Sequence, residues 1–184
     1  AFNITTSVKP EKPDGLILYN GQEKNHSGDF ISVGIKNGFI EFRFELGGGV
    51  TVIRSDKPVS TNQWHLIQIW RERHVGKLRV DSQDIVTSSA NSKYIGLDLT
   101  QPLYIGGVPD FGNLPMNRGF NSGFVGCIAL FRSGSKQYEL IKEAIGKHKV
   151  GRCDTCQHNP CLNSGTCVET VSRHSGFQCF CVPG

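Results

Sequence analysis

One stretch of the sequence decides the fold: Phe30-Ile-Ser-Val-Gly-Ile-Lys36, then Asn37-Gly38, then Phe39-Ile-Glu-Phe-Arg-Phe-Glu-Leu46. Asn-Gly between two β-forming runs is the strongest local hairpin signal, because both residues tolerate the positive φ angles of a type I′ turn. In the second run apolar and charged residues alternate, which places them on opposite faces of a strand. The stretch predicts an antiparallel hairpin with one face in a core and one face in water.

The same alternation continues on both sides of this hairpin, in short runs separated by glycine-containing turns. No helical period persists for three turns, and the one candidate helical turn, residues 141–145, is followed at once by glycine. About ten strands at this spacing predict an all-β chain folded as a two-sheet sandwich. The further strands are expected near residues 15–20, 50–55, 63–71, 77–82, 102–106 and 124–131, with another possible around 137–141.

The whole chain has 184 residues, of which 38% are apolar, 20% are charged and 22 are glycine. This ordinary globular composition excludes collagen, coiled coils and extended disorder. No window approaches 18 uninterrupted apolar residues, so no membrane span is expected, and the start Ala1-Phe-Asn-Ile4 lacks the pattern of a signal peptide. A core domain of about 150 residues fits this length, and the remaining appendage needs disulfides.

All seven cysteines lie in the last third of the chain. Such density among glycine and polar residues predicts disulfides, which indicate an oxidising, extracellular compartment and therefore secretion. Two N-glycosylation triplets agree with secretion, Asn3-Ile-Thr5 and Asn25-His-Ser27. The composition changes after Val150, which predicts a larger domain of residues 1–153 and a small disulfide-rich one of residues 154–184.

The spacing of the last five cysteines, Cys156-x4-Cys161-x5-Cys167-x11-Cys179-x-Cys181, resembles an EGF-like module. The resemblance implies that Cys156 pairs with Cys167 and that Cys161 pairs with Cys179. The sixth cysteine of that family is absent, so we expect a truncated module cut from a longer protein, with Cys181 unpaired.

Cys127 and Cys153 are then left to pair with each other inside the larger domain. The alternative for the tail is zinc, because Cys153, Cys156, His158 and Cys161 stand at plausible ligand spacing. Zinc accounts for fewer cysteines and expects a reducing compartment, so we favour disulfides.

Positive charge is concentrated in residues 132–152, where six basic residues against two acidic ones account for the whole formal net charge of +4. Such a cluster attracts polyanions such as heparan sulfate, and the alternative is a solvated strand and connector. Nucleic acid is not expected, because no basic motif with interleaved aromatic residues occurs. The basic residues are Arg132, Lys136, Lys142, Lys147, Lys149 and Arg152.

No catalytic arrangement is found in the sequence. No Gly-x-Ser-x-Gly elbow occurs, and the histidines form no spaced ligand set. Glu41 and Glu45 share one strand face, but four residues separate their backbones by about 13 Å, more than the ~6.5–9.5 Å of an inverting glycosidase pair. We interpret them as exposed glutamates flanking Arg43 and expect a binding protein, with a sandwich hydrolase as the rival.

Three stretches resemble laminin G-like domains: residues 28–47, Pro102-Leu-Tyr-Ile-Gly-Gly107 and Gly123-Phe-Val-Gly-Cys127. The resemblance covers nearly all of residues 1–153. It implies a laminin G-like β-sandwich (jelly roll) followed by the EGF-like module, in a basement-membrane heparan sulfate proteoglycan. Such domains usually have one or two more strands before the segment corresponding to Phe2–Val8. If such a strand normally covers a sheet edge, we expect this chain to expose that edge or to cover it with a substitute.

Many members of this family bind one Ca²⁺ at a rim of the sandwich. Carried over by motif position, the ligands are the side chains of Asp29 and Asp98 and the backbone carbonyls of Leu46 and Gly96. Ca²⁺ prefers about six to eight oxygens, so positions remain for water or an acidic ligand, with a weak Kd of roughly 10⁻⁴ to 10⁻³ M. The alternative is that Asp29 caps a turn and Asp98 is a solvated loop residue.

The resemblance also implies partners: acidic glycans of the dystroglycan type, heparan sulfate, integrins and other matrix proteins. We expect glycan oxygens to displace water from calcium, while basic neighbours such as Lys24, Arg54 or Lys93 add a positive field. A glycan on Asn25 would screen the same rim. The alternative is a structural spacer that has no functional calcium site and binds heparin or proteins through residues 132–152.

Overall fold

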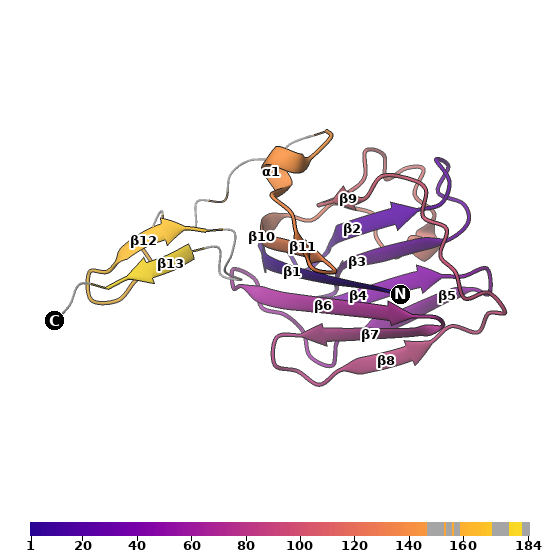
Figure 1. The fold of residues 1–184 in the computed structure, drawn as a ribbon, viewed down its shortest axis with the longest axis horizontal. Coiled ribbons are helices and arrows are strands. Elements are labelled where there is room, and N and C mark those ends of the chain that lie inside the picture. Colours follow the sequence, from indigo (N-terminus) through magenta and orange to yellow (C-terminus); the bar gives the residue numbers. More distant parts are fainter. Residues whose placement is uncertain (147–152, 154–155, 157–158, 171–176, 182–184) are drawn as a thin grey trace.

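The computed structural model describes residues 1–146, 153, 156, 159–170 and 177–181, and its strands form two antiparallel sheets that pack face to face (Figure 1). The six-stranded sheet has the order β11-β10-β1-β6-β7-β8, and the five-stranded sheet has the order β5-β4-β3-β2-β9. A third, two-stranded sheet pairs β12 with β13 in the cysteine-rich tail.

The bounds of the elements are β1 Phe2–Pro10, β2 Gly15–Gly21, β3 Phe30–Lys36, β4 Phe39–Glu45, β5 Val50–Arg54, β6 His65–Glu72, β7 Val75–Val80, β8 Val86–Ser89, β9 Tyr104–Ile105, η1 Met116–Arg118, β10 Gly126–Ser133, β11 Lys136–Gln137, α1 Leu140–Glu143, β12 Thr166–Glu169 and β13 Phe177–Phe180. The sandwich confirms the predicted all-β class. The single turn of α1 lies where either a helical turn or a connector was expected.

The hairpin of β3 and β4 is confirmed residue by residue. Lys36 pairs with Phe39, and the two turn residues between them, Asn37 and Gly38, have φ angles of 51° and 79°. The alternate side chains of β4 point into the core between the sheets, where Phe42 and Phe44 are fully buried. Two-residue turns with positive φ match the twist of the flanking strands, which explains why this register is fixed.

β1 lies in the middle of the six-stranded sheet, paired with β10 on one side and β6 on the other. Of the two outcomes considered for the start of the chain, an exposed edge is not what residues 2–10 show, because they occupy a central strand that is paired on both sides. Apolar alternation did not predict this strand, since its buried middle is the polar run Thr5-Thr-Ser7. The hydroxyl of Thr6 is satisfied there by a hydrogen bond to the carbonyl of Leu130 (2.9 Å).

The outer face of the five-stranded sheet is not the solvent face that alternation predicted. Residues 106–123 cover part of it and form a second core with apolar side chains of β2 and β3, among them Leu16 and Phe30. Glu41 is only 4% exposed, and its carboxylate lies 2.7 Å from the guanidinium of Arg43. The prediction of two exposed glutamates is therefore wrong, because Glu41 is buried in an ion pair and the side chain of Glu45 is only 20% exposed.

Three disulfides occur in the last third of the chain: Cys127–Cys153, Cys156–Cys167 and Cys161–Cys179. The last two are the pairs that the EGF-like resemblance implied, and Cys181 is an exposed free thiol. The zinc alternative is wrong, because its three cysteines are all oxidised; His158 lies outside the described residues.

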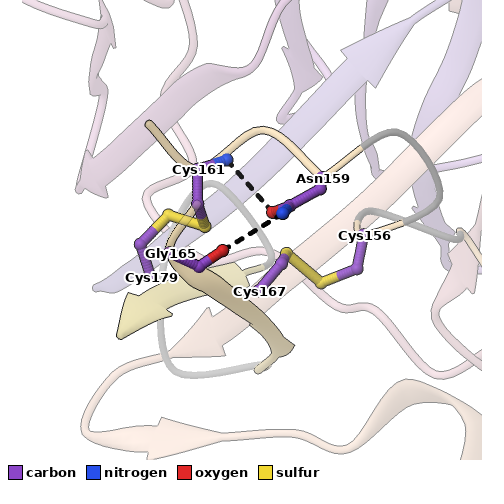
Figure 2. Close-up of a disulfide and its surroundings, with 6 residues drawn as sticks. All are labelled: Cys156, Asn159, Cys161, Gly165, Cys167 and Cys179. Carbon is purple, nitrogen blue, oxygen red and sulfur yellow. Dashed lines mark hydrogen bonds between the residues drawn. A yellow bond between two sulfur atoms is a disulfide. The ribbon is translucent and has the colours of Figure 1, made fainter. Parts of the chain in front are cut away.

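Asn159 organises the turn between two of these disulfides (Figure 2). Its side-chain amide donates to the carbonyl of Gly165 (3.1 Å), and its side-chain oxygen accepts from the backbone N–H of Cys161 (3.3 Å). The turn thus has hydrogen bonds of its own in addition to its covalent links. No helix within the described ranges has the length and apolarity needed to cross a bilayer.

Candidate ligand-binding rim

The candidate site is the end of the sandwich toward which the arrows of β2, β4 and β6 point (Figure 1), which we call the rim. Asp29 immediately precedes β3. Because Phe30 pairs with Glu45, Asp29 lies across from Leu46, the residue that follows β4. Residues 91–99 cross this end without forming a strand. There the backbone N–H of Asp98 donates to Oδ2 of Asp29 (3.2 Å), which brings together two residues 69 positions apart.

Two further hydrogen bonds hold the crossing segment against the strands. The hydroxyl of Ser92 donates to the carbonyl of Leu46 (2.6 Å), and the guanidinium of Arg71 donates to the carbonyl of Ile95 (2.6 Å). Gly96 follows Ile95 and is exposed, with nothing within 4 Å of the position that a Cβ would take. The four residues predicted as calcium ligands are thus gathered at one end of the molecule.

The donor chemistry of this group suits a hard cation, because every predicted ligand atom is an oxygen. The carboxylate of Asp29 accepts only the one long bond from Asp98 among the described residues, and a carbonyl such as that of Leu46 has a second lone pair. No three side chains of the His, Cys, Asp or Glu type come together in the described part of the chain. A calcium ion here would therefore depend on backbone carbonyls and water as well as two carboxylates.

Arg71 weakens the attraction of the rim for a cation. Its side chain is only 4% exposed, and burial lowers its pKa while the nearby Asp29 carboxylate partly offsets that effect. A positive charge this close to Asp29 opposes a second cation. A cation at the rim would therefore be held less tightly than by the oxygen ligands alone.

Asp29 does not cap a local turn, as the alternative interpretation required. Its own backbone N–H is bound by the side-chain oxygen of Gln22 (3.0 Å) and its carbonyl by the Gln22 N–H (2.8 Å), while its carboxylate accepts from the distant Asp98. The loop of residues 22–29 is therefore closed by Gln22, which leaves the Asp29 side chain at the rim.

Beside Asp29 lies an open hollow of about 350 Å³, which we call the rim hollow. It lies between the loop of residues 25–29 and residues 115–118, and Glu45 and Gly47 also line it. Its lining includes the polar residues Asn25, Asp29, Glu45, Asn117 and Arg118. Polar groups at a concave surface orient a hydroxylated ligand by hydrogen bonds.

Arg118 is the residue at this end that sequence reasoning missed. Its side chain is 3% exposed, lies over the ring of Phe30 (4.0 Å) and donates to the carbonyls of His26 and Gly28 (3.2 Å to the latter). Its Nη1 also lies 3.6 Å from a Glu45 carboxylate oxygen. A lone arginine in a loop gives no sequence signal for such a role.

His26 also lines the rim hollow, and its pKa is affected by Arg118. Partial burial, and after it the positive charge of Arg118, lower the pKa of His26, whose ring lies edge-on to Tyr19 (5.3 Å). His26 is therefore neutral at neutral pH, so the charge of the hollow comes from Asp29, Glu45 and Arg118.

Of the basic neighbours expected at the rim, Arg54 is misplaced. It pairs with Glu41 at the far end of β5, and its guanidinium lies over the ring of Phe39 (4.0 Å). Lys93 does lie near the rim, with its ammonium 5.2 Å from the ring centre of Tyr94. Tyr94 is 56% exposed and lies against Gly47, which makes it a second residue that sequence reasoning did not identify.

The basic segment is largely neutralised where the structure describes it. Lys136 lies 2.8 Å from Glu143, and Lys142 lies 2.5 Å from Glu139. The hydrogen bond that Lys136 donates to Glu143 raises the pKa of Lys136. Arg132 is exposed on β10, whereas Lys147, Lys149 and Arg152 lie outside the described residues.

Comparison with known proteins gives consistent matches. Residues 8–136 match the Laminin G domain family. The chain is 36% identical over 189 residues to the mouse basement membrane-specific heparan sulfate proteoglycan core protein, covering 100% of this chain and 5% of that protein. It is 36% identical over 194 residues to mouse neurexin-2, covering 98% of this chain and 11% of that protein.

Among solved structures, domains LG4-5 of the mouse laminin α1 chain share the fold with a TM-score of 0.73 and 24% identity, over 83% of this chain and 40% of that one. The chain thus corresponds to a small part of the curated proteins it matches. The name of the basement-membrane proteoglycan supports an extracellular location. The matches and the sandwich together show that the chain belongs to the laminin G domain family, whose members here are binding modules without enzymatic activity.

Proposed function

We propose that this chain is a calcium-dependent module that binds acidic glycans of the extracellular matrix at the rim, followed by an EGF-like module in residues 154–184. The observation that supports it is the hydrogen bond between Asp98 and Asp29, because it joins two predicted ligand segments at one end of the sandwich. Family membership supports a binding role in the matrix.

The ligands proposed for the ion are the carboxylates of Asp29 and Asp98 and the carbonyls of Leu46 and Gly96. When bound, calcium supplies coordination positions that carboxylate or hydroxyl oxygens of a glycan can fill. Ser92 and Arg71 orient the segment by holding the carbonyls of Leu46 and Ile95. Lys93 adds positive potential near the rim, which favours an anionic partner.

The charge of the rim hollow explains why the ion would matter for an acidic ligand. Asp29 and Glu45 contribute two negative charges and Arg118 one positive charge, while His26 is neutral. Without a cation the hollow is therefore net negative and repels a glycan carboxylate. Two added positive charges reverse the sign, so we expect the chain's own residues to select acidic over neutral glycans only in the presence of calcium.

Thermal melting during a calcium titration tests the metal site. Ten times the Kd should stabilise the chain by about 1.4 kcal/mol, a rise in Tm of roughly 3–6 °C for a chain of this size. Asp29→Asn and Asp98→Asn should abolish the rise, whereas Asp56→Asn, an exposed change after β5 at the other end, should preserve it. An unchanged Tm at 10 mM calcium would favour the structural spacer.

Binding to a glycan array tests the ligand class. Glucuronate-containing glycans of the dystroglycan type should bind in calcium and lose binding in a chelator, in parallel with Asp29→Asn. Heparan sulfate binding that survives both changes would instead point to residues 132–152. Integrins and other matrix proteins are further proposed partners, to be tested with the same variants.

A further inference from the structure

The Asn25-His26-Ser27 triplet lies at the edge of the rim hollow, and all three residues line it together with Asp29. Asn25 and Ser27 are exposed. A sugar attached to Asn25 would thus begin at the hollow itself, only four residues from the proposed calcium ligand.

The Asn25 side chain is already oriented for such a modification. Its Oδ1 accepts from both the backbone N–H (3.0 Å) and the hydroxyl (2.7 Å) of Ser27. Its Nδ2, the atom that would carry the sugar, makes no hydrogen bond to the residues that the structure describes. The modification would therefore cost the folded chain none of these contacts.

The loop that carries Asn25 is fixed in place. Arg118 reaches from the opposite wall and binds the carbonyls of His26 and Gly28, which flank Ser27. The N–H of His26 also donates to the carbonyl of Glu23 (2.9 Å). Because the loop is held on both sides of the triplet, an attached sugar starts from a defined position beside the hollow.

The hollow matches one sugar ring in size and chemistry. About 350 Å³ is at the small end of the range for ligand sites. Asp29, Glu45 and Asn117 offer acceptors for hydroxyl groups, and Asn117 also offers a donor.

We propose that an N-linked glycan on Asn25 lies in the rim hollow and restricts the access of other glycans to the rim. The first part stands on the geometry of Asn25, and the second part rests on the proposed function. The chain would then exist in two forms, an open rim without this glycan and a covered rim with it.

The modification is an ordinary glycosyl transfer from a lipid-diphosphate-linked oligosaccharide. Nδ2 of Asn25 forms a bond to the anomeric carbon as the bond from that carbon to the diphosphate oxygen breaks. The electron pair of the broken bond leaves on the lipid diphosphate, and Nδ2 gives up one proton.

Asn3 provides a matched comparison within the chain. It is exposed on β1, but its triplet continues into Ile4 and Thr5, which are buried, and the whole triplet is paired with β6. It does not line the hollow and β1 belongs to the six-stranded sheet, although Asn3 lies at the rim end of that sheet because Phe2 pairs with Arg71. Asn3→Gln therefore removes a triplet without changing a residue that lines the rim hollow.

The test uses the full chain secreted from mammalian cells as wild type, Asn25→Gln, Ser27→Ala and Asn3→Gln. Peptide mass mapping should find hexose-containing glycan on Asn25 in wild type and Asn3→Gln. An unmodified Asn25 in wild type overturns the proposal. Ser27→Ala guards against an effect of the Asn25 side chain itself, because it removes the triplet and retains the amide.

The position of the sugar is read from backbone amide chemical shifts after the glycan has been trimmed to its first sugar. Relative to both unglycosylated variants, the amides of Gly47 and Asn117 should shift, although both are distant in sequence from Asn25. Unshifted Gly47 and Asn117 amides would show that the sugar lies elsewhere and would overturn the proposal.

Access is measured as the Kd for a glucuronate-containing oligosaccharide in 5 mM calcium. The unglycosylated variants should bind about tenfold more tightly than wild type, a difference of about 1.4 kcal/mol. Equal Kd values overturn the masking. If no form binds, the proposed function fails, and the amide shifts still decide whether the sugar occupies the hollow.

Discussion

Asp29 and Asp81 lie at opposite ends of the sandwich, each next to the end of a strand, and their carboxylates are used in different ways. Asp81 accepts from the ring of His65 (2.8 Å) with one oxygen and from the backbone N–H of Leu66 (2.7 Å) with the other. Asp29 accepts one longer bond, from the N–H of Asp98 (3.2 Å). The first carboxylate is occupied on both oxygens by protein donors, and the second is not.

The difference separates a structural carboxylate from one that can take a ligand. Short hydrogen bonds to both oxygens stabilise the fold and leave few lone pairs for an outside partner. A single long bond contributes little to stability but keeps the group near its neighbours and open to a cation. Residue type and position at a strand end do not distinguish the two cases, whereas the bonding partners do.

The largest effect should come from removing the structural carboxylate. Asp81→Ala should lower the free energy of unfolding by about 2–3 kcal/mol, because it deletes a charged acceptor and leaves the buried His65 without it. Asp29→Ala in calcium-free buffer should cost below about 1 kcal/mol. Urea denaturation of both variants measures the difference, and equal losses would contradict the distinction between the two ends.

A somewhat smaller loss should follow from weakening the rim itself. Arg118→Met should cost about 2 kcal/mol, because it leaves the carbonyls of His26 and Gly28 without their charged donor. Hydrogen exchange should speed up in residues 22–29. Arg132→Met, on the exposed part of β10, is the control. A rim loop whose exchange is unchanged in Arg118→Met would show that the loop does not depend on this arginine.

A smaller effect should appear as a dependence on pH at the Asp81 end. The hydrogen bond to Asp81 raises the pKa of His65 in the folded chain. The resulting stabilisation is complete below the unfolded pKa of about 6.5 and is lost as the pH rises through the folded value. The advantage of wild type over His65→Gln should therefore shrink between pH 6 and 8. Asp29→Asn should keep the wild-type dependence of stability on pH. If Asp29→Asn instead changed this dependence as His65→Gln does, the pH dependence could not be assigned to the pair of His65 and Asp81.

The smallest effect should come from an exposed ion pair. The hydrogen bond from Lys136 lowers the pKa of Glu143, but water and salt screen this contact. Glu143→Gln should leave Tm unchanged within error at both low and high salt. A clear, salt-sensitive drop in Tm would show that solvent exposure does not determine how much each of these carboxylates contributes to stability.

The β-sandwich could be predicted from local sequence because the residues of its main hairpin fix the pairing of the two strands. Asn37-Gly38 fixes the turn, and the alternation around it places Phe42 and Phe44 in the core. β1 was missed because its buried side chains include the polar residues Thr5, Thr6 and Ser7, of which Thr6 donates its hydroxyl to Leu130 on the neighbouring β10. β8 was missed as well, since its four residues Val86–Ser89 are mostly polar.

The rim was predictable only in part. The resemblance to laminin G-like domains selected Asp29 and Asp98, and the structure places them side by side. The sequence did not indicate three further rim residues, Arg118, Arg71 and Tyr94. Their roles depend on contacts with segments that are distant in sequence. Burial of Glu41 was missed for the same reason, since the covering residues 106–123 come much later in the chain.

The crossing segment at the rim is attached in an unusual way. No sheet ladder runs through residues 91–99, and hydrogen bonds that involve side chains fasten the segment at Ser92, Ile95 and Asp98. Loops of this kind tolerate insertion at small entropic cost. The positions between the fastening points can therefore diversify in length and composition while both sheets keep their register. A library randomised there would turn the sandwich into a general display scaffold.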